Sequence, residues 1–238
     1  MTSAAHAAEA HEHSHADVSG GWLRAAVFGA MDGLVTNTAL VAGVGGGGAA
    51  PRAIVLAGTA SLVAGAISMA LGEYTSVKTQ NEQLDLEVEK ERRELARNPE
   101  GELAELVGML RARGVDDGLA HQVAVQLSRD PETALRLHVV AEIGLNPEDK
   151  PSPATAAVSS FLTFGTGALL PLLPYLFGLS LLWVALLCGG VGLVVAGAVS
   201  SRFTPRPWWF AGLRQLVFGA LAAGVTYSIG SLIGVSFA

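Results

Sequence analysis

Four glutamates near the middle of the chain repeat one spacing. Within EVEKERRELARNPEGELAEL, Glu91 and Glu94 stand three residues apart, as do Glu102 and Glu105, and the two pairs are offset by 11. Carboxylates at positions i and i+3 share a helix face, and the break at 98–99 (Asn-Pro) lets a second helix fold back against the first. Four converging carboxylates suit hard or borderline divalent cations, which take oxygen ligands. The same pattern also fits a solvated acidic face, because neighbouring lysine and arginine side chains supply ion-pair partners.

A second candidate pair lies later in the chain, in LHVVAEIGL. His138 and Glu142 stand one helical turn apart. Imidazole suits Fe, Mn and Zn, so the pair is a candidate addition to the acidic cluster. A lone histidine is also common as a packing or surface residue, and this alternative stays open.

Three further candidates lie inside apolar segments: Asp32, Met69 and Glu73. A carboxylate in hydrocarbon is costly and is usually functional. Met69 precedes Glu73 by one helical turn, and its thioether favours Fe²⁺, Co²⁺ or Zn²⁺ over Mg²⁺ and Ca²⁺. Alternatively, Met69 only packs and Glu73 reaches back to the membrane surface. Asp32 stands well inside its segment and has no such alternative.

The composition indicates the kind of protein that positions these residues. Half of the 238 residues are hydrophobic, 15% are charged, and the mean hydropathy is +0.43. These values predict an all-α integral membrane protein. A spanning helix needs about 20 apolar residues, and five segments qualify. They are residues 22–44, residues 53–77, two helices within 151–201 separated by a turn at 176–180, and residues 208–235.

Residues 79–150 form a charged insert between the second and third spans. They hold 16 of the 21 acidic residues, and their proline, asparagine and glycine punctuation is helical. We expect helices at 74–97, 99–113, 116–128 and 131–144, the first continuing span two. The chain thus divides into a disordered leader (1–20) containing histidines, two spans (21–78), an acidic metal-binding domain (79–150) and three spans (151–238).

Basic residues predict the orientation in the membrane. The insert holds nine of the 15 lysines and arginines, and Arg202 and Arg206 lie between spans four and five. The other two loops carry only Arg52. By the positive-inside rule, the N-terminus and residues 79–150 are cytoplasmic and the C-terminus is outside. With no targeting signal and much alanine and glycine, the expected location is a bacterial plasma membrane.

Four motifs together resemble one known family. They are MDGLVTNTALVAGV, SMALGEYTSVKTQNE, EKERREL..NP.GELAEL and AEIGL, and they occur in the order found in the vacuolar iron transporter family. The resemblance covers residues 22–238. It implies a homodimer, not an enzyme, that exports Fe²⁺ and related ions (Mn²⁺, Co²⁺, Zn²⁺) from the cytosol in exchange for protons, with the pore at the dimer interface. It implies no tightly bound cofactor and no nucleic-acid partner.

The resemblance also assigns the metal-binding residues by position. The pore residues of the family fall on Asp32, Met69 and Glu73, and its cytoplasmic glutamates fall on Glu91, Glu94, Glu102 and Glu105. The late methionine and glutamate of the family fall on His138 and Glu142. An acidic position beside that methionine is Val139 here, so the cluster is expected to hold fewer ions.

Two other functions compete with transport. A membrane-bound ferroxidase of the di-iron type needs Glu-x-x-His motifs on two helices, and the only match is Glu12 to His15, in the leader. A metal buffer or sensor would use the spans only as an anchor, and an anchor gains nothing from Asp32 and Met69.

Overall fold

The computed structural model describes residues 21–144 and 146–237, and this part of the chain is helical without strands. The expected leader lies outside the described residues. The elements are α1 Gly21–Gly46, α2 Pro51–Arg97, α3 Pro99–Ala112, α4 Asp117–Leu127, α5 Pro131–Ile143, α6 Pro153–Leu169, the 3₁₀ turn η1 Leu170–Leu172, α7 Leu173–Leu176, α8 Leu182–Ser200, the 3₁₀ turn η2 Ser201–Phe203 and α9 Trp208–Phe237.

Five helical stretches of the described chain are long and apolar enough to cross a membrane. They are Gly21–Gly46, the apolar part of Pro51–Arg97, Pro153–Leu176, Leu182–Phe203 and Trp208–Gly234. The prediction of an all-α integral membrane protein with five spans is therefore confirmed. Within the third stretch, the prolines at 171 and 174 coincide with a break of the helix into α6, η1 and α7, as their missing N–H groups lead one to expect.

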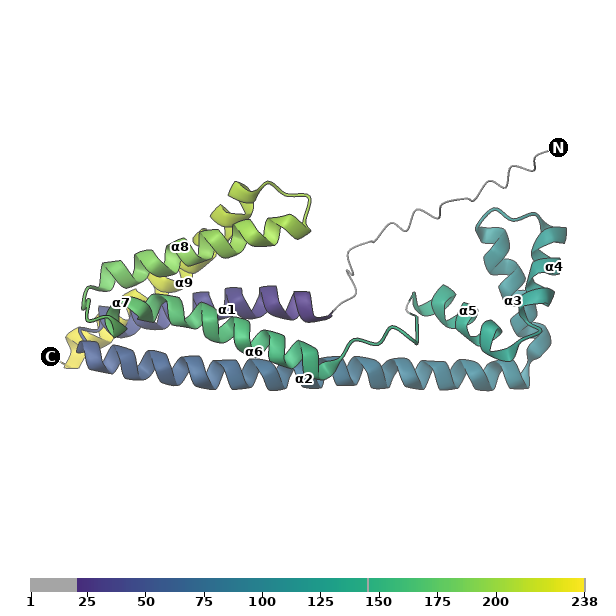
Figure 1. Ribbon diagram of the computed structural model, residues 1–238, viewed down its shortest axis with the longest axis horizontal. Coiled ribbons are helices and arrows are strands. Elements are labelled where there is room, and N and C mark those ends of the chain that lie inside the picture. The colour runs from purple at the N-terminus through teal and green to yellow at the C-terminus, as the bar shows by residue number, and fades with distance from the viewer. Residues whose placement is uncertain (1–20, 145, 238) are drawn as a thin grey trace, which may run out of the picture.

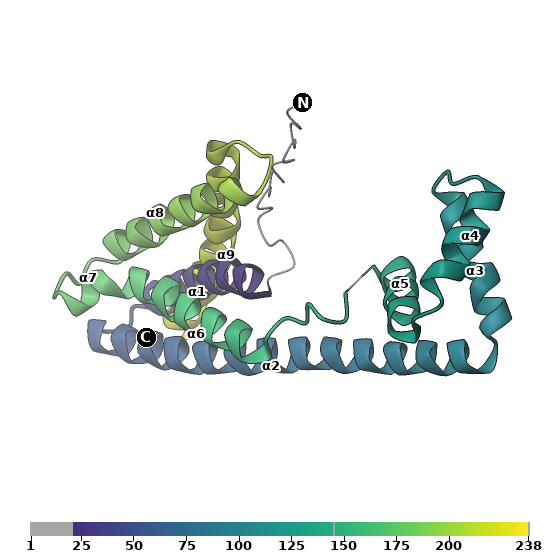
Figure 2. The same ribbon diagram turned by 45° about the vertical axis from the view of Figure 1, so that its right-hand side comes forward.

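Helix α2 is the longest element and joins the two parts of the molecule. It has 47 residues and, at 1.5 Å per residue, a length of about 70 Å. Its first half packs in the bundle, and its second half projects beyond the bundle and carries α3, α4 and α5 (Figures 1 and 2). The Asn98 side chain accepts a hydrogen bond from Gly101 N (3.2 Å) and so caps α3 where α2 ends.

The insert differs in one respect from the expected arrangement. Helix α3 does not fold back along α2 but leaves it steeply, and α5 instead lies beside α2 (Figures 1 and 2). Buried Leu84 of α2 packs against Leu135 and Val139 of α5, which explains why α5 returns to α2. Glu102 still reaches the end of α2, because it lies in the first turn of α3, next to the corner.

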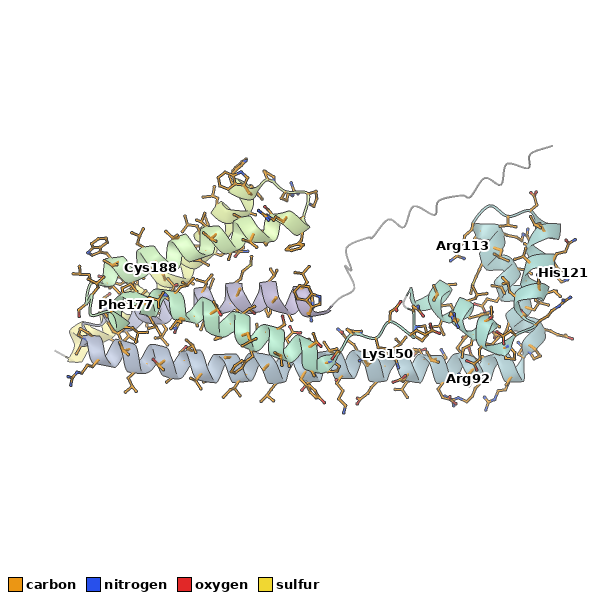
Figure 3. All side chains as sticks on the ribbon, viewed as in Figure 1. Arg92, Arg113, His121, Lys150, Phe177 and Cys188 are labelled. Carbon is orange, nitrogen blue, oxygen red and sulfur yellow. The ribbon has the colours of Figure 1, made fainter. Side chains whose placement is uncertain are left out.

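Ion pairs fasten the insert along α2. Arg92 pairs with Glu132 at the start of α5, and Lys150 pairs with Asp85 (Figure 3). Glu132 and Lys150 lie on opposite sides of His138 in sequence, so α5 is held to α2 at its first turn and again where the chain leaves it. Such exposed pairs each contribute little, but together they favour one placement of α5.

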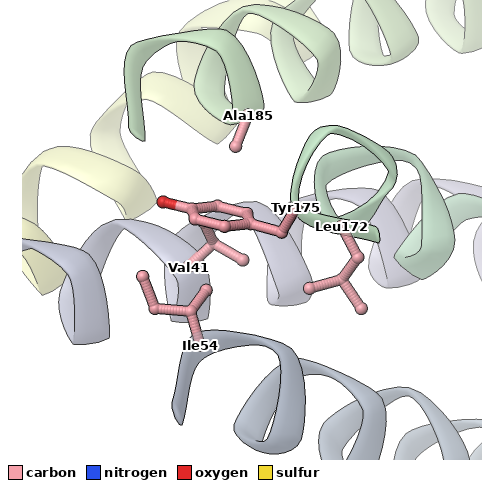
Figure 4. Packing of buried hydrophobic residues seen from close by; sticks show 5 residues of the cluster. All are labelled: Val41, Ile54, Leu172, Tyr175 and Ala185. Carbon is pink, nitrogen blue, oxygen red and sulfur yellow. The ribbon is translucent and has the colours of Figure 1, made fainter. Parts of the chain in front are cut away.

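The end of the bundle far from the insert has an apolar core drawn from five elements. Val41, Ile54, Leu172, Tyr175 and Ala185 form it, and their side chains meet in Figure 4. The cluster joins α1, α2, η1, α7 and α8, so it fixes α1 and α2 relative to each other at this end. These two helices carry the candidate intramembrane residues.

Glycine allows α1 and α6 to approach closely. A Cβ at Gly33 would lie 2.2 Å from the carbonyl oxygen of Phe164, and one at Gly167 would lie 2.4 Å from that of Ala30. Helices in membranes associate through such small residues, since the hydrophobic effect does not drive them together there. The position of Asp32 on α1 therefore depends on this contact.

We expect Gly167→Ala to destabilise the bundle and Gly165→Ala on the same helix to leave it intact. The added methyl at position 167 forces α1 away, and overpacking costs about 1–3 kcal/mol. A Cβ at position 165 meets nothing within 4 Å, and alanine is the better helix former by about 0.5–1 kcal/mol. Thermal unfolding in detergent measures both variants, and equal stability of the two would contradict the close contact.

Candidate metal sites

The insert brings a histidine and several carboxylates to one point. His138 Nδ1 lies 3.2 Å from Glu91 Oε1, 3.5 Å from Glu102 Oε2 and 4.0 Å from Glu142 Oε1. One ligand atom each from Glu91, His138 and Glu142 lie within 4.8 Å of one another. Helices α2, α3 and α5 thus each supply part of the cluster, which we call the insert cluster (Glu91, Glu94, Glu102, Glu105, His138 and Glu142).

The centre of the insert cluster is buried and unsatisfied. The side chains of His138 and Glu91 are 1% and 7% exposed. Both ring nitrogens of His138 and Oε1 of Glu91 have no hydrogen-bond partner. Buried polar atoms are nearly always paired, so these orphaned atoms need an explanation. For His138 Nδ1 and Glu91 Oε1, which face each other, a bound cation supplies one, because imidazole nitrogen and carboxylate oxygen are both good ligands for divalent transition metals.

Burial and neighbouring carboxylates raise the pKa of two glutamates of the cluster, Glu91 and Glu142. Burial, and after it the charges of Glu142, Glu102, Glu94 and Glu105, together raise the pKa of Glu91 to about 7. Burial also raises the pKa of Glu142, followed by the charge of Glu105 and a hydrogen bond with it. Near neutral pH, Glu91 therefore exists as a mixture of its protonated and ionised forms, and a bound cation would favour the ionised form.

Not every predicted residue lies at the centre of the cluster. Glu94 and Glu105 are exposed, and they act on Glu91 by their charge from the rim. Val139, which stands where the family carries an acidic residue, is 1% exposed and packs with Leu84 and Leu135. Position 139 is thus part of the apolar contact between α5 and α2 and adds no ligand.

The three candidate residues of the spanning helices line one cavity, which is a second candidate site. A cavity of about 330 Å³ between α1, α2 and α6 is lined by Asp32, Met69, Glu73 and six other residues. We call it the membrane cavity. Asp32 is partly exposed and accepts a hydrogen bond from Thr36 Oγ1 (3.2 Å). Met69 both lines the cavity and packs beside Phe164, which also lines it. The wall of the cavity thus offers carboxylate and thioether ligands.

Glu73 does not reach out to water. It is 7% exposed, and Arg24 Nη2 donates to its Oε2 at 2.9 Å. The alternative in which Glu73 extends to the membrane surface therefore disagrees with the structure. Arg24 was not predicted as a partner of Glu73, although the sequence carries a signal for it. Arg24 stands at the insert end of α1 and Glu73 near the same end of the apolar part of α2, so the two antiparallel helices bring the charges together.

A buried asparagine is a second feature that sequence analysis missed. Asn37 is fully buried, and its Nδ2 donates to the carbonyl oxygens of Ala168 (2.6 Å) and Gly58 (3.3 Å). It therefore ties α1 to both α6 and α2 in the middle of the bundle. A polar residue in an apolar segment was the available signal.

We expect the metal-free protein to lose stability as pH rises from 5 to 7. The raised pKa of Glu91 means that the folded chain holds this proton more tightly than the unfolded chain, whose pKa is 4.5. The stability from this proton is complete below about pH 4.5 and lost by about pH 7, at a cost of about 3 kcal/mol. Thermal unfolding with a chelator present measures the slope.

Glu91→Gln should flatten this slope, because glutamine carries no charge at any pH. The matched control is Glu100→Gln, which removes an exposed carboxylate from the same insert and should keep the slope. A wild-type slope that persists in Glu91→Gln would contradict the assignment to Glu91.

Comparisons with known proteins agree on one family. The model of the VIT family matches residues 23–231. A vacuolar iron transporter of Acanthamoeba castellanii is 37% identical, over 95% of this chain and 84% of its own length. Vacuolar iron transporter 1 of Oryza sativa is 30% identical, over 95% and 92%. Vacuolar iron transporter homolog 1 of the same plant is 36% identical, over 90% and 75%. The chain therefore belongs to the VIT family.

Proposed function

We propose that this chain transports divalent transition-metal ions across a membrane, with Fe²⁺ as the main cargo and Mn²⁺, Co²⁺ and Zn²⁺ as related ones. The observation that carries the proposal is the membrane cavity, where Asp32, Met69 and Glu73 line one space within the spanning helices. Relatives named as vacuolar iron transporters support iron as the cargo. The relatives are named as transporters, which is consistent with the expectation that the chain is not an enzyme.

The insert cluster serves as the collecting site in this proposal. Its orphaned atoms lie outside the apolar part of α2, where hydrated ions arrive, and the same helix leads to the membrane cavity. Ions would bind first between Glu91, His138 and Glu142, whose ligand atoms lie within 4.8 Å of one another, and then pass to Asp32 and Met69. A site that combines carboxylate and imidazole ligands favours transition metals over Mg²⁺ and Ca²⁺.

The expected orientation of the chain supports the proposed direction of transport. At the insert end lie Arg24 and the loop with Arg202 and Arg206, whereas Arg52 lies at the other end. The positive-inside rule then supports a cytoplasmic insert and export from the cytosol. The names of the relatives refer to the vacuole and their organisms are eukaryotes, so they give no support to the bacterial plasma membrane expected from composition.

A second copy of the chain would complete the pore. The cavity lining includes exposed Ser68 and Gly72 and partly exposed Asp32. In a lone subunit this surface would place a carboxylate against lipid, at a cost of several kcal/mol by order of magnitude. Leu56, Val63, Ile67 and Leu71 are also exposed on α2. A homodimer that pairs the α1–α2 faces would cover the cavity and double its ligands.

Proton exchange has a physical route in both sites. Cation binding to the insert cluster displaces a proton from Glu91, whose pKa of about 7 makes this exchange possible near neutral pH. In the membrane cavity, Asp32 can accept a proton from the far side once the ion has left, which reduces the cost of an empty charged site. Export of the ion would then be coupled to entry of protons.

We expect Asp32→Asn and Met69→Leu to reduce Fe²⁺ and Mn²⁺ uptake into proteoliposomes with an acidic interior by at least about tenfold. Asp32→Asn removes the negative charge that compensates the ion for the loss of its hydration shell. A loss of more than about 1.4 kcal/mol of ion-binding free energy, which is expected in a medium of low dielectric constant, gives a tenfold reduction. Glu102→Gln should reduce uptake mainly at low ion concentration, because it weakens collection rather than passage.

Glu100→Gln, on the same helix as Glu102, is the matched control and should transport normally. Wild-type rates in Asp32→Asn would contradict the pore. Metal binding by the wild type without any flux would favour a membrane-anchored buffer or sensor instead.

A further inference from the structure

The carboxylate of Glu73 is occupied by a cation that belongs to the chain itself. Arg24 Nη2 donates to Glu73 Oε2 at 2.9 Å, and Glu73 lines the membrane cavity. Guanidinium remains charged at any pH that the protein meets. The ion pair therefore neutralises one of the two carboxylates that the cavity offers to its cargo.

The two partners differ in how freely they can move. The Arg24 side chain is 60% exposed, whereas that of Glu73 is 8% exposed. Arg24 lies in the first turn of α1, at the insert end, where a long side chain can reach water or the membrane surface. Glu73 is fixed among the helices of the bundle. When the pair separates, Arg24 is the partner that leaves.

Charge balance decides what can replace Arg24. With both carboxylates ionised, Asp32, Glu73 and Arg24 sum to a formal charge of −1, and removal of Arg24 changes it to −2. A divalent ion compensates the second value. A monovalent ion only replaces the single charge of Arg24, and the charge-assisted hydrogen bond between Arg24 and Glu73 is lost. The exchange therefore brings no electrostatic gain.

We propose that Arg24 is an internal counter-ion of the membrane cavity, which occupies Glu73 between transport cycles, is displaced by divalent ions and excludes monovalent ones. The proposal rests on the proposed transport function. It assigns Arg24 to ion selectivity, where a purely structural ion pair would serve only to hold α1 to α2.

The test measures Mn²⁺ uptake and K⁺ leak in proteoliposomes for the wild type and Arg24→Gln. Without the competing guanidinium, we expect the KM for Mn²⁺ to fall about fivefold, the equivalent of about 1 kcal/mol for an ion pair with one exposed partner. The maximal rate should stay within about twofold of the wild type. K⁺ leak, followed with a dye sensitive to membrane potential, should rise above that of the wild type.

Two further variants separate competition from structure. Arg24→Lys keeps a cation and should retain a KM near the wild-type value and a low K⁺ leak. Arg52→Gln removes an exposed arginine at the opposite end of the bundle and should change neither quantity. An unchanged KM and leak in folded Arg24→Gln would overturn the proposal, whereas absence of wild-type flux would instead overturn the proposed transport function.

A measurement on the wild type keeps the proposal testable if Arg24→Gln does not fold. Phenylglyoxal modifies free guanidinium groups, and mass spectrometry locates the modified residues. Mn²⁺ should increase modification of Arg24, because the ion releases it from Glu73, and should leave Arg52 unchanged. Modification of Arg24 that is independent of Mn²⁺ would overturn the proposal.

Discussion

Negative charge that is withdrawn from water has to be balanced nearby, and α2 carries such charge at two levels. Glu73 is buried in the bundle and Glu91 is buried under the insert, 18 positions further along one uninterrupted helix. The chain supplies its own cation to Glu73, in Arg24. At Glu91 it supplies only a histidine without hydrogen bonds and more carboxylates, which leave room for a cation from outside.

The remaining elements place partners beside these two positions. Asn98 and Pro99 end α2 and start α3, so that Glu102 comes to the corner. The apolar contact of α5 with α2 then brings His138 to Glu91. In the bundle, glycines let α6 approach α1, and this contact fixes Asp32 beside the α2 residue Met69. Packing in each part of the molecule thus determines which polar groups meet.

Much of this arrangement follows from the sequence, because its signals are local. Proline, asparagine and apolar runs marked the helices within a few residues, and the three-residue glutamate spacing marked the insert cluster. Contacts between distant segments were harder. The packing of α5, rather than α3, against α2 depends on Leu84 and Val139. In the sequence, nothing distinguishes these two residues from any other apolar pair. The pairing of Arg24 with Glu73 depends on the antiparallel alignment of two helices, so its signal lay in the positions of two charges in separate segments and not in a local pattern.

Divalent cations should occupy both levels of α2, and location of bound ions tests this most directly. Crystals grown with Co²⁺ or Mn²⁺ would reveal the ions by anomalous scattering. We predict one peak bounded by Glu91, His138 and Glu142 and another beside Asp32 and Met69, with Arg24 turned away from Glu73. Peaks only on exposed carboxylates, with His138 and Asp32 uncoordinated, would contradict it.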